Sequence, residues 1–179
     1  MEYTEIINFW FNEIDTSLWF KKNEEFDQLL RDRFSAVHRS AAQGELYSWR
    51  GNPEGRLAEI IVLDQFSRNM FRDSAEAFAN DPMALVLSQG AVEVGDDQRV
   101  EPSHRAFLYM PFMHSESPLI HEQAVKLFSQ AGLERNLEFE MKHKAIIECF
   151  GRYPHRNAVL GRESTDAELD FLQQPGSSF

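Results

Sequence analysis

The chain has 179 residues, 42% of them hydrophobic and including 15 phenylalanines, which supplies one buried core and argues against disorder. The formal net charge of −11 disfavours nucleic acid and anionic membrane surfaces as partners, because such a field repels polyanions. A single cysteine, Cys149, excludes an intramolecular disulfide. We therefore expect one cytoplasmic domain over residues 1–179 with a frayed tail at 172–179, no secretory signal and no membrane-spanning segment.

The N-terminal half shows helical periodicity. An apolar segment comes first, carrying Ile6, Ile7, Trp10, Phe11 and Ile14. Asn23, followed by two glutamates and an apolar stripe at steps of three and four, predicts an N-cap and an amphipathic helix that ends near Gly44. Asn52-Pro53 combines a cap with proline at the first helical position. It predicts a helix that runs to about Arg72.

The middle of the chain repeats these signals. Asp81-Pro82 predicts the same kind of start for a helix that ends near Gly95. Ser103 is expected to open a short aromatic helix over residues 107–110, which Pro111 should end or kink because proline lacks the backbone donor.

The C-terminal part contains three further helix signals. A Ser-Pro pair at 117–118 predicts a helix that Gly132 closes, and a second helix should run from about 134 to 150 with Gly151 after its end. A Thr-x-x-Glu capping box at 165–168 predicts a last short helix. No segment alternates as a strand would, so we predict an all-α fold of antiparallel helices; a repeat of about 34 residues is not detectable.

Common catalytic and nucleotide-binding motifs are missing. The chain has no phosphate-binding loop, no dinucleotide fingerprint and no nucleophile elbow. His121-Glu122 resembles the start of a metalloprotease helix, but Val125 stands where the second histidine must be. We therefore predict no cofactor and no metal, and leave open whether the protein is an enzyme.

The first candidate site lies on the third helix. Helical spacing places five polar residues in one sector opposite an apolar side: Asp64, Gln65, Arg68, Asn69 and Arg72. Asp64 and Arg68 are four residues apart in the favourable orientation for an ion pair. The sector is either a solvated face with a weak pair or the wall of a groove.

The second candidate is the turn at 113–118. His114 and Glu116 could form an acid–base pair or two metal ligands, and a helix N-terminus follows them. The simpler reading is that Glu116 and Ser117 cap that helix.

The third candidate is the segment 151–162, which holds three arginines, Arg152, Arg156 and Arg162, together with His155 and Asn157, and no acidic residue. Guanidinium groups suit carboxylate or phosphate. The alternative is that these arginines staple helices through Asp64, Glu116 or backbone carbonyls.

His143 shares a helical stripe with apolar residues and is predicted to face the core or a pocket. A lone histidine in such a stripe is more often a hydrogen-bonded core residue than a catalyst.

Several phrases of the sequence resemble a known bacterial family, the domain-of-unknown-function family nine-twenty-four. They are Phe9-Trp10-Phe11, Trp19-Phe20, Leu63 to Phe66 with Arg68-Asn69, FLYMPFMHSE (107–116), residues 143–150, and RYPHRNAVLGR (152–162) with the following Ser164-Thr165. Ser67 departs from the family pattern, in which proline is expected, and puts a kink there in doubt. The resemblance implies a tetratricopeptide-like array of antiparallel helices but supplies no function.

Three functions remain open. The leading hypothesis is a pocket for a small anionic metabolite; the others are a helical scaffold for a peptide or protein partner, and a hydrolase or isomerase that uses the same polar cluster, with or without a metal at His114 and Glu116. The candidate binding residues are Asp64, Arg68, Asn69, His114, Glu116, His143, Arg152, His155, Arg156, Asn157 and Arg162.

Overall fold

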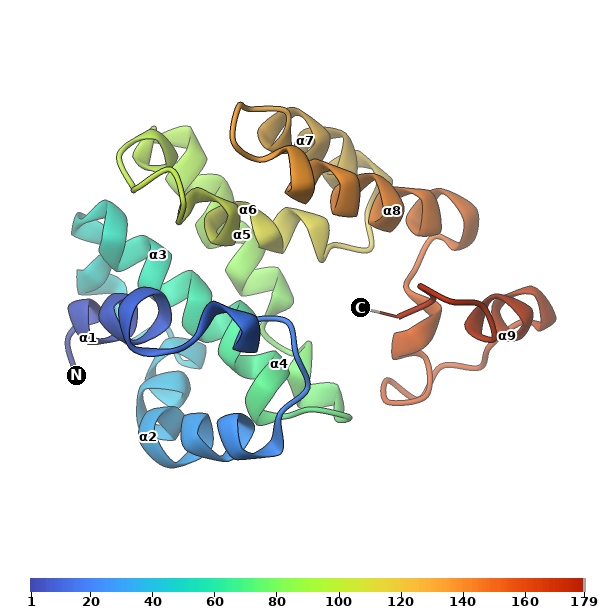
Figure 1. The fold of residues 1–179 in the computed structure, drawn as a ribbon, viewed down its shortest axis with the longest axis horizontal. Helices are drawn as coiled ribbons and strands as arrows, with labels where there is room; N and C mark the ends of the chain where they lie inside the picture. Colours follow the sequence, from blue (N-terminus) through green and yellow to red (C-terminus); the bar gives the residue numbers. More distant parts are fainter. Residues whose placement is uncertain (179) are drawn as a thin grey trace.

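The computed structural model describes residues 1–178, and this part of the chain is all-α, without a β-strand (Figure 1). The helices are α1 (Tyr3–Asn8), α2 (Glu24–Ala42), α3 (Pro53–Ile61), α4 (Ser67–Met70), α5 (Asp81–Glu93), α6 (Arg105–Met113), α7 (Pro118–Phe128), α8 (Glu134–Phe150) and α9 (Asp166–Leu172). Phe9–Glu13 and Val62–Phe66 are π-helical, and short 3₁₀ turns lie at Thr16–Leu18, Tyr47–Gly51, Ala75–Ala77, Asp96–Gln98 and Pro154–Arg156. None of these helices combines the length and apolar character that crossing a membrane requires.

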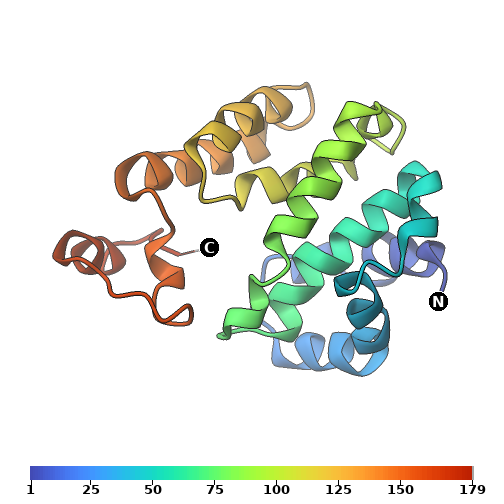
Figure 2. The same ribbon diagram turned by 180° about the vertical axis from the view of Figure 1, so that it is seen from behind.

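The helices pack in two patterns. In the N-terminal half α1 packs on α3, and α2 packs on α4 and on the π-helical segment before it. From α5 onward each helix packs on the next, α5 on α6, α6 on α7 and α7 on α8. The last helix, α9, lies at the opposite end of the molecule from α1 in both views (Figures 1 and 2).

Two apolar clusters form the core. The larger one draws buried side chains from α1 through α7 and is rich in aromatic residues. The smaller one consists of Ile146, Ile147 and Tyr153, with Phe150 and Phe171 against it. The Tyr153 hydroxyl donates to the Met113 carbonyl oxygen at 2.6 Å, so the small cluster joins the larger one at the end of α6.

Most predicted helix signals are confirmed. The side chains of Asn23 and Asn52 cap α2 and α3 by accepting from the backbone N–H of Phe26 and Glu54. The capping box of α9 is present. Gly151 follows α8 in the left-handed conformation, with φ of 70°, as a glycine after a helix commonly does.

Two local predictions were wrong. Asp81 does not cap α5: it lies in the first turn, and its carboxylate binds two arginine side chains instead. Of the two outcomes predicted for Pro111, the end of the helix is wrong, because α6 begins at Arg105 and continues to Met113; the kink stays a prediction. Every α6 residue from Ala106 onward is buried, so packing on its neighbours outweighs the local cost of proline.

The π-helical segment Val62–Phe66 lies directly before Ser67, where the family pattern suggested a kink. Nearby side chains bind carbonyls in this irregular turn: the Ser67 hydroxyl donates to the Leu63 oxygen at 2.6 Å, and Arg68 donates to the Asp64 oxygen at 2.8 Å. Because a π-turn carries extra residues, it shifts the directions in which later side chains point. The polar sector predicted from regular helical spacing is split, because Arg68 binds Asp81 whereas Asn69 binds Asp27.

Candidate functional site

Five charged or ionisable residues meet where α4, α5, α6 and the turn after α8 come together. We call them the central cluster: Asp64, Arg68, Asp81, His114 and Arg156. Asp81 is bound by both guanidinium groups, in a bidentate pair with Arg68 (2.9 and 3.0 Å) and in a single contact with Arg156 (3.2 Å). The predicted pair between Asp64 and Arg68 is present at 2.9 Å.

Asp64 is completely buried and ionised. Its carboxylate accepts from the His114 Nδ1 at 2.7 Å and from the Gln65 amide at 2.5 Å. Burial opposes ionisation, but Arg68 and His114 more than offset it and hold the pKa of Asp64 below its ordinary value. The pKa of His114 is lowered by burial and by Arg68 against the opposing effect of Asp64. His114 is therefore a neutral imidazole that donates its Nδ1 proton to Asp64.

Arg156 is 6% exposed and has an incomplete set of partners. Besides Asp81 it donates to the His114 carbonyl oxygen at 3.0 Å, and its guanidinium lies 4.5 Å from the Phe78 ring centroid and 4.6 Å from that of Tyr153. Its Nε is buried and has no hydrogen-bond partner within residues 1–178. Burial and the neighbouring Arg68 charge lower the pKa of Arg156. Among residues 1–178 its one ion pair is with Asp81, a carboxylate that Arg68 also binds.

The other two predicted arginines belong to a separate group, which we call the C-terminal lock: Glu116, Arg152, Asn157, Arg162 and Glu168. Arg162 forms a bidentate pair with Glu116 at 2.7 and 2.9 Å, and Arg152 forms one with Glu168 at 2.7 and 2.8 Å. Glu116 also accepts from the Tyr153 backbone N–H, and the Asn157 side chain accepts from Arg162. For these residues the geometry matches the alternative in which the arginines staple segments together.

Asn69 does not join either group. Its amide donates at 2.9 Å to Asp27 of α2, which also forms a bidentate pair with Arg72 at 2.7 and 2.9 Å. Glu116 faces Arg162 and the Tyr153 backbone, so the structure does not pair it with His114 as an acid–base or ligand pair. Ser117 precedes α7 but forms no side-chain cap.

His143 and His155 border the central cluster. His143 is buried, as its apolar stripe predicted, and donates from Nδ1 to the Phe139 carbonyl oxygen at 2.7 Å. Its ring centroid lies 6.5 Å from that of His114 and 5.8 Å from that of Tyr153. The His155 ring lies 5.6 Å from Tyr153. The aromatic ring of Tyr153, a member of the small apolar cluster, therefore contacts His143, His155 and Arg156.

Three residues that form part of the central cluster or contact it were not predicted from the sequence. Asp81 was predicted to cap a helix, and neither Phe78 nor Tyr153 was named as a candidate site residue.

A further buried pair, His121 and Glu140, links α7 to α8 at 2.7 Å, and His121 Nε2 donates to the Ser115 carbonyl oxygen at 2.8 Å. Within residues 1–178 no group of three or more His, Cys, Asp or Glu side chains is arranged to hold a metal ion.

Comparison with known proteins settles the family. A family model described as "Bacterial protein of unknown function (DUF924)" matches residues 6–176. The chain belongs to this family. It is similar to a solved structure, that of the protein of unknown function ATU0120 from Agrobacterium tumefaciens, with 38% sequence identity, 96% of each chain covered and a TM-score of 0.91. A search of curated proteins gave no match. DUF924 membership confirms the resemblance noted in the sequence, and neither comparison carries a function.

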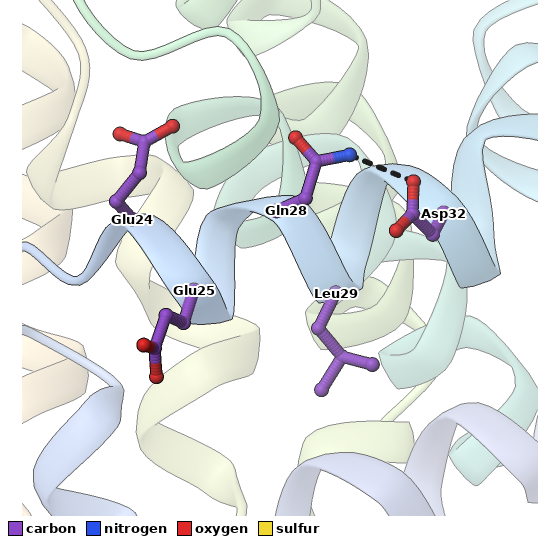
Figure 3. Close-up of a pocket in the computed structure, with 5 residues that line it drawn as sticks. All are labelled: Glu24, Glu25, Gln28, Leu29 and Asp32. Carbon is purple, nitrogen blue, oxygen red and sulfur yellow. Dashed lines mark hydrogen bonds between the residues drawn. The ribbon is translucent and has the colours of Figure 1, made fainter.

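Open hollows on this DUF924 fold lie away from the central cluster. One is lined by five residues of α2 (Figure 3): Glu24, Glu25, Gln28, Leu29 and Asp32. Another lies over α5, α6 and α7 and is lined by Gln89, Val92, Glu93, Phe112, Gln123, Lys126 and Leu127. The exposed edge of the central cluster consists of Arg68, Asp81 and His114, with 20%, 15% and 15% of their side-chain surface accessible.

Because histidines are buried, we expect the free energy of unfolding to fall as the pH drops from about 6.5 to 5. Burial lowers the pKa of His143 to about 3 and that of His155 to about 4, whereas an unfolded histidine titrates near 6.5. In this window the unfolded chain binds more protons than the folded one, so the free energy of unfolding decreases with falling pH, by up to about 1.4 kcal/mol per pH unit for each histidine. Urea denaturation at pH 7, 6 and 5 measures this.

A matched variant isolates one histidine. His143→Gln should show a shallower loss than wild type between pH 6.5 and 5, because it removes one group whose pKa differs between the folded and unfolded states. Equal slopes for the two proteins would mean that His143 takes up its proton as readily in the folded state as in the unfolded one.

Proposed function

We propose that the central cluster binds a small anionic metabolite through a carboxylate or phosphate group. The observation that carries the proposal concerns Arg156: among residues 1–178 this buried guanidinium forms an ion pair with one carboxylate, Asp81, which Arg68 also binds. Buried charges are normally fully paired, and two converging guanidinium groups favour bidentate oxyanions.

The geometry of Asp81 suggests how an anion would be held. Its carboxylate binds both arginines in the way that a ligand carboxylate would, and it lies in the first turn of α5 at the exposed edge of the cluster. An anion arriving from solvent would compete with Asp81 for Arg68 and Arg156. The three neutral histidines around the cluster, His114, His143 and His155, would supply uncharged polar contacts.

Arg156→Ala should abolish binding of inorganic phosphate and small carboxylates, and Asp81→Asn should tighten it about tenfold or more by removing the competing charge, a change of about 1.4 kcal/mol. A ligand at 100 times its dissociation constant stabilises the folded state by about 2.7 kcal/mol. That raises the melting temperature by roughly 5–11 °C in a domain of this size. A thermal-shift screen against phosphate, phosphorylated and carboxylated metabolites measures the effect.

The control for this prediction is Arg152→Ala, which breaks a bidentate pair in the C-terminal lock and leaves the central cluster intact. It should keep the ligand-induced shift. Arg156→Lys keeps the positive charge but lacks the planar set of N–H donors of a guanidinium group. A folded Arg156→Lys protein should therefore bind the anion more weakly than wild type. An unchanged shift in that variant would contradict the proposal.

A second candidate is a scaffold for a peptide or protein partner. The position of two open hollows favours it, because one lies on the face of α2 (Figure 3) and the other lies over α5, α6 and α7, where a partner could bind from solvent. A tetratricopeptide-like array, which the family resemblance implies, would suit this role, and the sequential packing from α5 to α8 is compatible with it. This candidate is favoured if no metabolite in the screen raises the melting temperature and if Arg156→Ala itself strongly destabilises the protein.

A further inference from the structure

The imidazole of His114 is held in one tautomer by the residues around it. Its Nδ1 lies 2.7 Å from Oδ1 of Asp64, a carboxylate that is completely buried and fixed by Arg68 and Gln65. A buried carboxylate of this kind keeps the proton on the facing ring nitrogen and stabilises the imidazolium if a second proton arrives. The lone pair of the neutral ring is consequently on Nε2.

The Nε2 atom of His114 is available as an acceptor. No hydrogen bond among residues 1–178 uses it, and 15% of the side-chain surface is accessible. The two guanidinium groups of the cluster lie near His114. Arg156 donates to the backbone oxygen of His114, and Arg68 contacts the same Asp64 oxygen that His114 does. Both arginines therefore lie near His114, the residue that carries the acceptor.

We propose that His114 Nε2 accepts the proton of a hydroxyl group on an oxyanion ligand, which makes the substrate class hydroxycarboxylates or hydroxylated phosphate esters. This rests on the anion site proposed above and deepens it. The oxyanion would bind Arg68 and Arg156, and the hydroxyl would meet Nε2. In a full transfer the proton moves to Nε2, the electron pair of the O–H bond stays on the ligand oxygen, and the imidazolium donates from Nδ1 to Asp64. Asp64 is a positioning residue in this step.

Nuclear magnetic resonance of protein labelled with ¹⁵N-histidine tests the proposal, with His114→Gln used for assignment. At pH 7 wild-type His114 should carry its proton on Nδ1 and show an unprotonated Nε2. Addition of glycolate should shift the Nε2 resonance, whereas acetate, which lacks the hydroxyl, should not. Glycerol 3-phosphate and inorganic phosphate form a second pair with the same expectation. In Asp64→Asn we expect both tautomers, because the neutral amide no longer fixes the proton.

The outcomes separate the two proposals. Binding itself is followed in a second sample labelled with ¹⁵N-arginine, by chemical-shift changes at the guanidinium groups. If glycolate or glycerol 3-phosphate binds by this measure and the Nε2 resonance does not shift, the role of His114 is overturned while the anion site stands. Binding by none of the four probes overturns both. A wild-type His114 with its proton on Nε2 overturns the inference on its own, and this reading does not depend on whether Asp64→Asn folds.

Discussion

Replacing Asp64 by alanine is expected to lower the free energy of unfolding by about 3–5 kcal/mol, the usual cost of removing one partner of a buried ion pair. Asp64 is completely buried and balances Arg68. Without it, the Nδ1 proton of His114 and the amide of Gln65 lose their acceptor, and each buried donor left without a partner costs about 1–3 kcal/mol. Urea denaturation followed by circular dichroism at pH 7 measures the change.

The matched control is Glu13→Ala, which removes a carboxylate from a more exposed pair with Arg33. Surface pairs of this kind contribute about 0–1 kcal/mol, so the control should stay within about 1 kcal/mol of wild type. The double variant Asp64→Ala/Arg68→Met should be destabilised by less than the sum of its single changes, because it leaves no uncompensated charge. A loss for Asp64→Ala no larger than that of the control would show that the cluster contributes little to the fold.

The local parts of the fold could be predicted because their causes are local. A cap such as Asn52 satisfies N–H groups within two or three residues, and a glycine such as Gly151 ends a helix through its own backbone freedom. Pro111 and Asp81 are the counterexamples. The fate of each depends on neighbours distant in the sequence: α6 is buried by packing on other helices, and Asp81 is bound by an arginine 75 residues away.

The candidate site was predictable to a smaller degree. The pairing of Asp64 with Arg68 follows from their spacing of four residues. The partner of Asn69 does not, because its amide binds Asp27 of α2, which lies 42 residues away in the sequence. Nor can spacing decide which arginine meets which acid, since Arg162 and Glu116 are 46 residues apart. Sequence therefore named most of the residues, and the fold divided them into the central cluster and the C-terminal lock.

This division bears on function. The C-terminal lock consists of bidentate pairs in which each arginine has its own carboxylate, as in a structural staple. The central cluster differs because two arginines share Asp81 and because, among residues 1–178, Nε of Arg156 and Nε2 of His114 have no hydrogen-bond partner. Groups with incomplete pairing are the ones that can accept a ligand, which is why the binding proposal is confined to the central cluster.

Gly55→Ala is expected to destabilise the protein by more than about 3 kcal/mol or to prevent folding. A Cβ atom at this position would lie 2.1 Å from the backbone oxygen of Trp49 and 2.9 Å from its carbonyl carbon. A clash with backbone cannot be relieved by rotating a side chain, so α3 or the 3₁₀ turn Tyr47–Gly51 would have to shift. Overpacking that moves backbone costs about 1–3 kcal/mol and sometimes more. Thermal and urea denaturation of the purified variant measure the loss.

The control is a second helical glycine, Gly90 in the last turn of α5, where an added Cβ would meet no heavy atom within 4 Å. Gly90→Ala should stabilise the protein by about 0.5–1 kcal/mol, because alanine loses less conformational entropy in a helix than glycine does. Both substitutions replace a helical glycine by alanine, so helix propensity alone predicts that both stabilise the protein. A stable Gly55→Ala protein would therefore mean that α3 does not approach Trp49 as closely as the structure has it, and the start of the helix that carries Asp64 would need to be placed differently.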